Sequence, residues 1–147
     1  MKTVQPSGKY DCIRIGNQIC FPLYACAKEI VRRYKPFLDE IDLTYTQYIT
    51  MMVLWEEKEI SVGELGKKLY LDTGTLSPLL KSMEKKSLLT RSRDTVDERI
   101  VKIAITKEGD ALREKAVRIP EKIGGCIKLS KDEAAFLYKI LYSMLPS

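Results

Sequence analysis

The stretch Ser61–Gly109 decides the fold: SVGELGKKLYLDTGTLSPLLKSMEKKSLLTRSRDTVDERIVKIAITKEG. It predicts a short helix over 62–69, a turn, and a second helix that starts near Gly74. Apolar residues recur along the second helix at the i, i+3, i+4 and i+7 spacing of one buried face: Leu76, Leu79, Leu80 and Met83. Polar and cationic residues follow its other face at a spacing of four: Thr73, Ser77, Lys81 and Lys85. Such a helix packs with one face and offers short polar and positive side chains with the other.

A basic β-hairpin is predicted directly after the second helix. The β-branched residues of 100–106 predict a strand that pairs with 88–93, and Asp94–Asp97 forms the tip. Three arginines flank this tip: Arg91, Arg93 and Arg99. A helix-turn-helix followed by a basic hairpin is the winged-helix arrangement, in which the second helix enters the major groove of DNA. The sequence therefore predicts duplex DNA as the partner.

The overall composition agrees with a polyanionic partner. The chain has 147 residues, which fits one domain, and it carries a net charge of +5 with a pI of about 9.0. The basic residues gather in and beside the quoted stretch: Lys67, Lys68, Lys81, Lys85, Lys86, Arg91, Arg93, Arg99, Lys102 and Lys107.

Several classes of protein are excluded or disfavoured. The chain has no histidine, which excludes His-based hydrolase triads and His-based zinc sites. Its four cysteines form no Cys-x-x-Cys pair, so we expect neither a metal nor a cofactor. No run of 18 apolar residues occurs, and the N-terminus lacks the apolar core of a signal peptide. We therefore expect a cytoplasmic protein with reduced thiols.

Helices are predicted on both sides of the winged segment. One covers about 15–39, with Pro22 in its first turns or at a kink and Pro36 near its end. A second covers 45–57 behind an N-cap at Thr44. Thr106 is the predicted N-cap of a helix that runs to about 119, where Pro120 interrupts it, and a last helix follows Ser130.

The terminal helices are more apolar than a small central domain requires. The simplest explanation is a homodimer interface built from both ends of the chain. A dimer with two DNA-reading heads also matches a palindromic site. We therefore predict a mainly α fold with a small β-wing: a single domain over 1–147, with a winged helix-turn-helix at 43–106 and dimerisation helices at 1–42 and 107–147.

Five segments carry a resemblance to a known family: NQICFPLYA (17–25), YKPFLDE (34–40), LTYTQY (43–48), LYLDTGTLSPLLKSME (69–84) and DERIVKIAIT (97–106). Together they resemble the MarR family of winged-helix regulators, and especially its organic-hydroperoxide-sensing OhrR-type repressors. The resemblance implies an obligate homodimer that binds a pseudo-palindromic operator. It also implies repression of peroxide-defence genes until a cysteine near the N-terminus is oxidised by an organic hydroperoxide.

The resemblance assigns roles to individual residues of the redox site. Cys20 lies where the family has its peroxide-reactive cysteine, and Tyr24 resembles the nearby tyrosine of the same subunit. Tyr34 and Tyr45 resemble the tyrosines that reach the thiolate from the other subunit, where their hydroxyls stabilise it. Cys126 falls in the region of the second cysteine that, in some members, forms an intersubunit disulfide with the first.

The resemblance also implies a set of DNA-contacting residues. Arg99 resembles the wing arginine that enters the minor groove, and Asp97 resembles the acid that orients it. Arg91 and Arg93 add positive charge to the hairpin. Six residues fall on the part of the recognition helix that faces the major groove: Asp72, Thr73, Thr75, Ser77, Lys81 and Ser82.

Other interpretations of these residues stay open at this point. The cysteines and tyrosines can be plain packing residues, and the lysines and arginines can be ordinary solvated charges. The signal can instead be a small phenolic or aromatic ligand bound between the dimer arms. A thiol peroxidase is a third possibility, although the chain carries a DNA-reading segment and lacks the Arg and Thr/Pro-rich surroundings expected of a peroxidatic cysteine.

Overall fold

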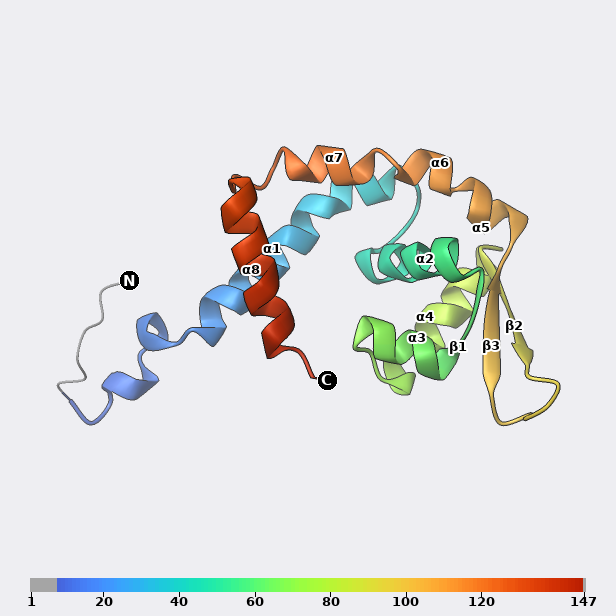
Figure 1. Ribbon diagram of the computed structural model, residues 1–147, viewed down its shortest axis with the longest axis horizontal. Coiled ribbons are helices and arrows are strands. Elements are labelled where there is room, and N and C mark those ends of the chain that lie inside the picture. The colour runs from blue at the N-terminus through green and yellow to red at the C-terminus, as the bar shows by residue number, and fades with distance from the viewer. Residues whose placement is uncertain (1–7, 147) are drawn as a thin grey trace.

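The computed structural model describes residues 8–146 and has two parts, a compact winged unit and an arm (Figure 1). The α-helices in chain order are α1 (Cys20–Asp39), α2 (Tyr45–Glu57), α3 (Val62–Leu69), α4 (Thr73–Lys85), α5 (Lys107–Ala111), α6 (Arg113–Ala116), α7 (Ile119–Gly124) and α8 (Lys131–Met144). The strands are β1 (Glu59–Ser61), β2 (Leu89–Arg93) and β3 (Val101–Ile105). Helices α2 to α4 and the sheet form the winged unit. The arm consists of α1, which extends from the winged unit toward the N-terminus, and of α5 to α8.

The sheet of the winged unit is antiparallel and has the order β1-β3-β2. Strand β3 lies in the middle, with Ile103 paired to Ile60 on one side and to Arg91 on the other. The hairpin of β2 and β3 confirms the predicted wing, and the short strand β1 adds a third strand to the sheet. Apolar side chains of α2, α3 and α4 form the core against this sheet, including Leu54, Leu65 and Leu80 at no more than 1% exposure.

The predicted helix caps are also present. Thr44 and Gln47 form a reciprocal capping box at the start of α2, and Ser130 and Glu133 form another at the start of α8. Thr106 accepts a hydrogen bond from the backbone N–H of Gly109 at the start of α5. Asp72 caps α4, which begins one residue before the predicted start.

Two predicted helix boundaries were wrong, and a proline in the first turn of the helix accompanies the observed starts of α1 and α7. Helix α1 starts at Cys20, and the preceding residues 15–17 form a 3₁₀ turn instead of continuing the helix. Pro22 therefore occupies the first turn, where its missing N–H needs no intrahelical acceptor. The helix predicted over 107–119 is divided into α5, α6 and the start of α7, and Pro120 lies in the first turn of α7 rather than interrupting a helix.

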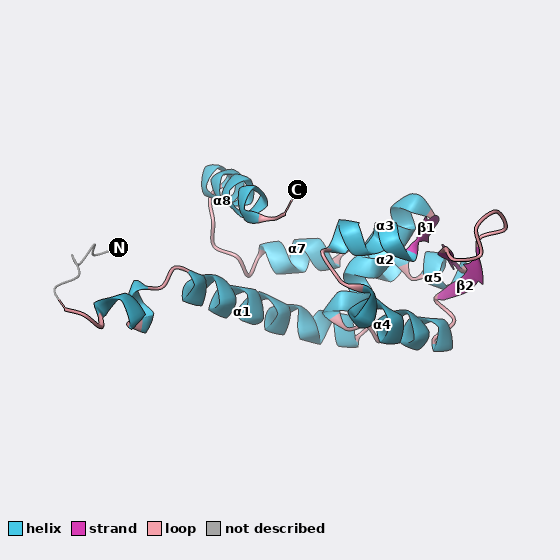
Figure 2. Cartoon of the chain, turned by 90° about the horizontal axis from the view of Figure 1, so that it is seen from below, coloured by secondary structure: helices cyan, strands magenta, loops and turns pink. Residues whose placement is uncertain are grey.

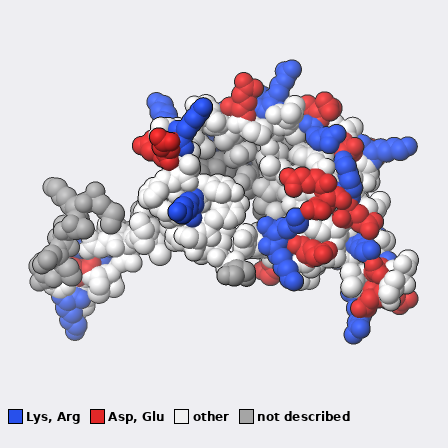
Figure 3. All heavy atoms as spheres, in the orientation of Figure 1, with Lys and Arg blue, Asp and Glu red and all other residues white. Residues whose placement is uncertain are grey.

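The arm carries a large apolar surface that the single chain leaves exposed. No residue of α8 is buried, and Phe136 and Tyr138 are more than 60% exposed. Helix α8 crosses α1 in Figure 1 but stands clear of it in the perpendicular view (Figure 2). Beyond the charged first turn of α8, few charged side chains cover α8 and the N-terminal half of α1, whereas charge gathers over the winged unit (Figure 3). Residues 1–7 of the predicted dimerisation segment lie outside the described residues.

Within the described residues, none of the helices has both the length and the apolar composition that crossing a membrane requires.

Gly109 sits at a close approach between α5 and the segment that joins α4 to β2, and it offers a test of the fold. A Cβ atom at this position would lie 2.2 Å from the carbonyl oxygen of Leu88, which accepts a hydrogen bond from Thr106. We expect Gly109→Ala to lower the free energy of unfolding by about 1–3 kcal/mol, as overpacking against a fixed neighbour does. Urea unfolding measures this change. Gly63→Ala is the control, because nothing lies within 4 Å of its added Cβ; equal losses in both variants would contradict the prediction.

Candidate DNA interface and cysteine site

The exposed face of α4 presents the polar residues that the sequence predicted. Thr73, Ser77 and Lys81 are exposed, and the Ser77 hydroxyl donates to the carbonyl oxygen of Thr73 at 2.9 Å. Lys81 takes part in no ion pair within residues 8–146. Short hydroxyls beside a free positive charge are suited to base edges and phosphates.

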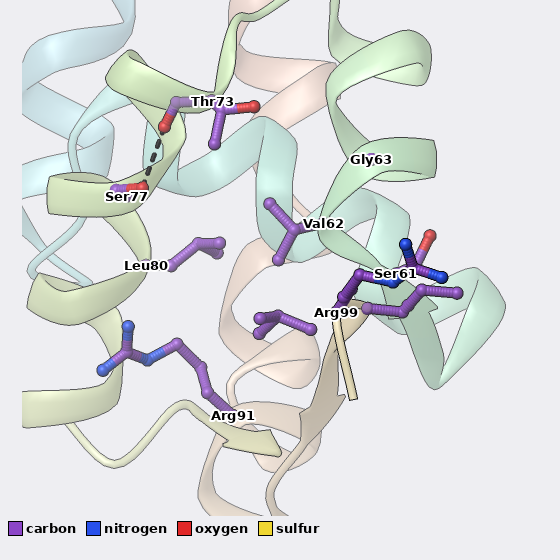
Figure 4. A pocket seen from close by; sticks show the side chains of 10 residues that line it. Ser61, Val62, Gly63, Thr73, Ser77, Leu80, Arg91 and Arg99 are labelled. Carbon is purple, nitrogen blue, oxygen red and sulfur yellow. Dashed lines mark hydrogen bonds between the residues drawn. The ribbon is translucent and has the colours of Figure 1, made fainter. Parts of the chain in front are cut away.

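A groove of about 410 Å³ separates α4 from the wing. Thr73, Ser77 and Leu80 line it from α4, and Arg91 and Arg99 line it from the hairpin (Figure 4). The structure therefore brings two of the predicted recognition-helix residues, Thr73 and Ser77, to the same groove as Arg91 and Arg99. Other predicted DNA-contacting residues do not line it: Asp72, Thr75, Lys81, Ser82 and Arg93.

The wing tip is held by two carboxylates. Asp97 accepts the backbone N–H of Arg99 at 3.0 Å and its Nε at 3.2 Å, while the Arg99 side chain stays 91% exposed. Asp94 accepts Lys102 Nζ at 2.6 Å and the backbone N–H of Val96 at 2.8 Å. These hydrogen bonds, the one from Lys102 first, lower the pKa of Asp94 to about 2. An ionised Asp94 thus fixes the loop from which Arg99 projects.

Other predicted DNA residues have partners inside the chain. Arg91 pairs with Glu84 of α4 at 2.7 Å, which ties β2 to the recognition helix, and Arg93 donates to the carbonyl oxygen of Glu98. Ser82 is half-buried and accepts a hydrogen bond from Gln47 of α2 at 3.2 Å.

The cap of α4 engages two further residues of the predicted set. Asp72 accepts the backbone N–H of Thr75 at 2.8 Å and its hydroxyl at 3.2 Å. Ser82 and Asp72 therefore have evident structural roles, and their contacts with DNA stay predictions.

Three tyrosines form a cluster where α1 meets α2. The rings of Tyr34 and Tyr45 have centroids 5.0 Å apart, and those of Tyr34 and Tyr48 are 5.9 Å apart. Burial raises the pKa of Tyr34, with further contributions from Tyr45 and Tyr48, and burial likewise raises the pKa of Tyr45. Their hydroxyls are therefore protonated at neutral pH and can donate a hydrogen bond to an anion.

Cys20 lies at the opposite end of α1 from this cluster. It is the first residue of α1 and is exposed, and Tyr24 follows one turn later on the same face. Tyr34 is fourteen residues further along the same helix, a rise of about 21 Å. Cys20 and Tyr24 are thus neighbours within the chain, whereas Tyr34 and Tyr45 of the same chain do not reach the thiol.

Cys126 lies between α7 and α8, also far from Cys20. Its carbonyl oxygen accepts a hydrogen bond from the Arg33 guanidinium at 2.5 Å, which places it beside the C-terminal half of α1. Arg33 is about 20 Å along the helix axis from Cys20, well beyond the 7 Å between Cα atoms that a disulfide permits. All four cysteines are free and exposed. A disulfide between Cys20 and Cys126 of one chain is incompatible with this conformation.

Sequence reasoning missed three residues that organise the site. Glu84 and Asp94 position the wing, and Gln47 bridges α2 to α4. Gln47 carried a visible signal, because it stands at the third position after the Thr44 cap. The two acids carried none, since a charge on a strand or helix surface does not reveal its partner. Within the described residues there is no cluster of His, Cys, Asp and Glu able to hold a metal ion.

The chain matches one family model and several curated relatives. The model of the SarA/Rot transcriptional regulators matches residues 32–116. The organic hydroperoxide resistance transcriptional regulator of Bacillus subtilis is 45% identical over 93% of both chains. The regulator SarZ of Staphylococcus aureus is 38% identical over 82% of both chains. These relatives are transcriptional regulators, so this chain is a transcriptional regulator and not an enzyme, which removes the thiol-peroxidase alternative.

Solved structures agree with this assignment. Reduced AbfR bound to DNA has a TM-score of 0.74 and 30% identity, and the alignment covers 92% of this chain and 95% of the other. The same regulator, from Staphylococcus epidermidis, is also known overoxidised on DNA, with a TM-score of 0.75, and in a disulfide form, with a TM-score of 0.62. The chain is related to these regulators over most of its length, and it has a winged helix-turn-helix and an apolar arm. It therefore belongs to the MarR family of winged-helix transcriptional regulators, in the branch of the organic hydroperoxide resistance regulator.

Proposed function

We propose that the protein is a homodimeric repressor that binds operator DNA when reduced and releases it when an organic hydroperoxide oxidises Cys20. One observation carries the proposal. The exposed Cys20 thiol lies at one end of α1 and the partly buried tyrosine cluster at the other, with a rise of about 21 Å along the helix from Cys20 to Tyr34. We propose that a second copy of the chain, with its α1 antiparallel to the first, brings the thiol of one subunit to the tyrosines of the other.

The exposed apolar arm supports the dimer. Large side chains of α8 and of the start of α1 are exposed in the single chain, including Phe21, Phe136 and Tyr138. Contiguous apolar surface of this kind marks an association site. We propose that the segments 1–42 and 107–147 form the dimer interface and that the segment 43–106 forms the DNA-reading head.

The groove between α4 and the wing supports the mode of DNA binding. We propose that Thr73, Ser77 and Lys81 face the major groove and that Arg99 enters the adjacent minor groove. Thr75, on the first turn of α4, joins the major-groove set, and Arg93 adds charge at the wing. Two such heads on one dimer fit a pseudo-palindromic operator.

The proposed switch is a two-step thiol reaction. The Cys20 thiolate attacks the peroxide O–O bond, one oxygen stays on sulfur as a sulfenic acid, and the other leaves with a proton as the alcohol. Tyr24, with Tyr34 and Tyr45 of the partner subunit, donates hydrogen bonds to the thiolate. The sulfenic acid then condenses with the Cys126 thiol of the partner subunit, forming a disulfide and water. AbfR, known reduced on DNA and in a disulfide form, supports this chemistry by similarity.

An operator-binding titration tests the proposal. The reduced protein is titrated onto a duplex that contains its operator, before and after treatment with cumene hydroperoxide and again after a thiol reductant. We expect tight binding, loss of binding, and recovery. Release by a phenolic ligand, with no response to hydroperoxide, would instead favour the alternative in which a small molecule bound between the dimer arms is the signal.

Lys81→Ala tests the contact of the recognition helix with DNA. We expect weaker operator binding and a smaller slope of log K against log salt, by about 0.9, because one phosphate contact is lost. The affinity is measured at several salt concentrations. Lys115→Ala is the control, since Lys115 is an exposed lysine of α6, away from the wing. An unchanged slope in Lys81→Ala would show that this lysine does not contact a phosphate.

A further inference from the structure

We propose that Gln47 is the positioning residue that couples the tyrosine cluster to the recognition helix and so transmits oxidation of the thiol to the DNA-reading face. This inference rests on the proposed function and specifies which contacts carry the change from the tyrosine cluster to α4. The structural basis is a partly buried hydrogen-bond bridge, centred on the buried Gln47, from the first turn of α2 to the end of α4.

Gln47 is a buried polar residue whose amide is engaged on both sides. The residue is only 4% exposed. The amide oxygen accepts the backbone N–H of Thr44 at 3.1 Å and Lys86 Nζ at 3.3 Å, and the amide nitrogen donates to the Ser82 hydroxyl at 3.2 Å. Rotation of the amide would break these bonds, and losing the hydrogen bonds of a buried polar group is costly.

One end of the bridge lies in the tyrosine cluster. Tyr45 is the first residue of α2, two positions before Gln47, and its ring contacts Tyr34 of α1. Tyr48 lies one position after Gln47 and contacts Tyr34 as well. When oxidation of the partner's thiol changes what Tyr34 and Tyr45 contact, the first turn of α2 is the part of the winged unit that is displaced first.

The other end of the bridge holds the recognition helix. Ser82 follows Lys81 directly on α4, and Lys86 lies at the C-terminal cap of the same helix. Lys86 also donates to the backbone carbonyl oxygen of Asp42 at 2.5 Å and pairs with its carboxylate at 3.1 Å. The end of α4 is therefore tied to the start of α2 at Gln47, and to Asp42, two residues before the Thr44 cap.

The geometry leaves α4 little freedom from α2. A shift of the α2 first turn either moves α4 with it or breaks buried hydrogen bonds to Gln47. Moving the helix costs less, because breaking these bonds removes partners from the amide of Gln47, which is buried. The displacement of the tyrosines thus reaches Lys81 and Ser77 as a change in the angle of the reading face.

The test measures coupling separately from folding and from thiol chemistry. Gln47→Met keeps the length of the side chain and removes every hydrogen bond of its amide. The readouts are the operator Kd of the reduced form, the Kd after cumene hydroperoxide, and the rate of sulfenic acid formation at Cys20. We expect an unchanged rate of oxidation and a ratio of oxidised to reduced Kd that falls by about tenfold, within the usual range of coupling between sites.

Ser82→Ala supplies a second variant that leaves the α2 capping box intact. It should reduce the same Kd ratio, and the double variant should lose no more than Gln47→Met alone, because both changes break one link. Thr50→Val is the matched control. Thr50 is a fully buried residue of α2 whose hydroxyl bonds only within its own helix, to the Thr46 carbonyl oxygen at 2.8 Å, so the ratio should stay at the wild-type value.

The possible results distinguish a failure of the Gln47 coupling role from a failure of the proposed function. If hydroperoxide does not release the wild-type protein from DNA, the proposed function fails. If the wild type is released while Gln47→Met and Ser82→Ala keep the full Kd ratio, the proposed function stands and the coupling role of Gln47 is overturned. A ratio that falls equally in Thr50→Val also overturns it, because general loosening of α2 would then suffice.

Discussion

Replacing Arg99 with alanine is expected to weaken operator binding by about 5- to 150-fold, the equivalent of 1–3 kcal/mol for one well-placed contact. The side chain is 91% exposed, and Asp97 orients it through the backbone N–H and Nε. Its charge projects from the tip of a hairpin that Asp94 and Lys102 hold in shape. In a narrow minor groove the negative potential is enhanced, so a guanidinium there contributes more than one on an open surface.

The measurement is an operator titration of reduced protein, with circular dichroism and sizing to show that Arg99→Ala remains folded and dimeric. Arg113→Ala is a suitable control, because it removes one positive charge from an exposed position on α6, far from the wing. Asp97→Asn should give an intermediate loss, since it keeps the guanidinium but weakens its orientation. Wild-type affinity in Arg99→Ala would remove the wing from the proposed binding mode.

The winged unit was predictable because its signals are local. The apolar spacing of Leu76, Leu80 and Met83 defines one helical face, and the caps at Thr44 and Thr106 mark helix starts whatever surrounds them. The β-branched residues around Ile103 likewise mark a strand without reference to the rest of the chain. Short-range periodicity and capping thus account for nearly every boundary between α2 and α5.

The errors and omissions have two other causes: local proline patterns that fit more than one position in a helix, and contacts between distant parts of the chain. Proline constrains a helix in its interior but fits its first turn, and the sequence around Pro22 and Pro120 does not show which applies. Ser82 lies at the border between the buried and exposed faces of α4. Only the position of Gln47, 35 residues earlier, turns its hydroxyl inward. The partners of Cys20 and Tyr34 lie in the proposed dimer, and spacing along one chain does not reveal them.

Replacing Cys20 with serine is expected to abolish the response to hydroperoxide while leaving reduced operator binding at the wild-type level. Serine is close in size to cysteine, so the exposed start of α1 should be preserved, but its hydroxyl cannot form a sulfenic acid. Operator titrations with and without cumene hydroperoxide measure the effect. Cys26→Ser is the control, because Cys26 lies further along the same helix and should leave the response intact. Release of Cys20→Ser by hydroperoxide would place the sensor elsewhere.

Replacing Cys126 with serine separates the second step from the first. Cys20 should still be oxidised, because that step needs only the thiolate and its tyrosine partners. The covalent dimer band on a non-reducing gel, which wild type should form with hydroperoxide and lose with reductant, should be absent. Release from DNA should become slower or partial, or should require an added small thiol, and over-oxidation to sulfinic acid should rise, because the sulfenic acid then persists.

The geometry of one chain predicts whether the disulfide lies within one chain or between two, and this can be tested. Arg33 holds the Cys126 backbone beside the C-terminal half of α1, about 20 Å from Cys20 along the helix. A bond within one chain would require α1 to unwind or the α7–α8 segment to leave it, so we expect the proposed disulfide to join two copies. Peptide mapping of the oxidised protein should therefore find the Cys20–Cys126 linkage only in the covalent dimer. An intrachain linkage, or a dimer band and release in Cys126→Ser equal to those of wild type, would show that Cys126 is structural and that Cys20 acts without it.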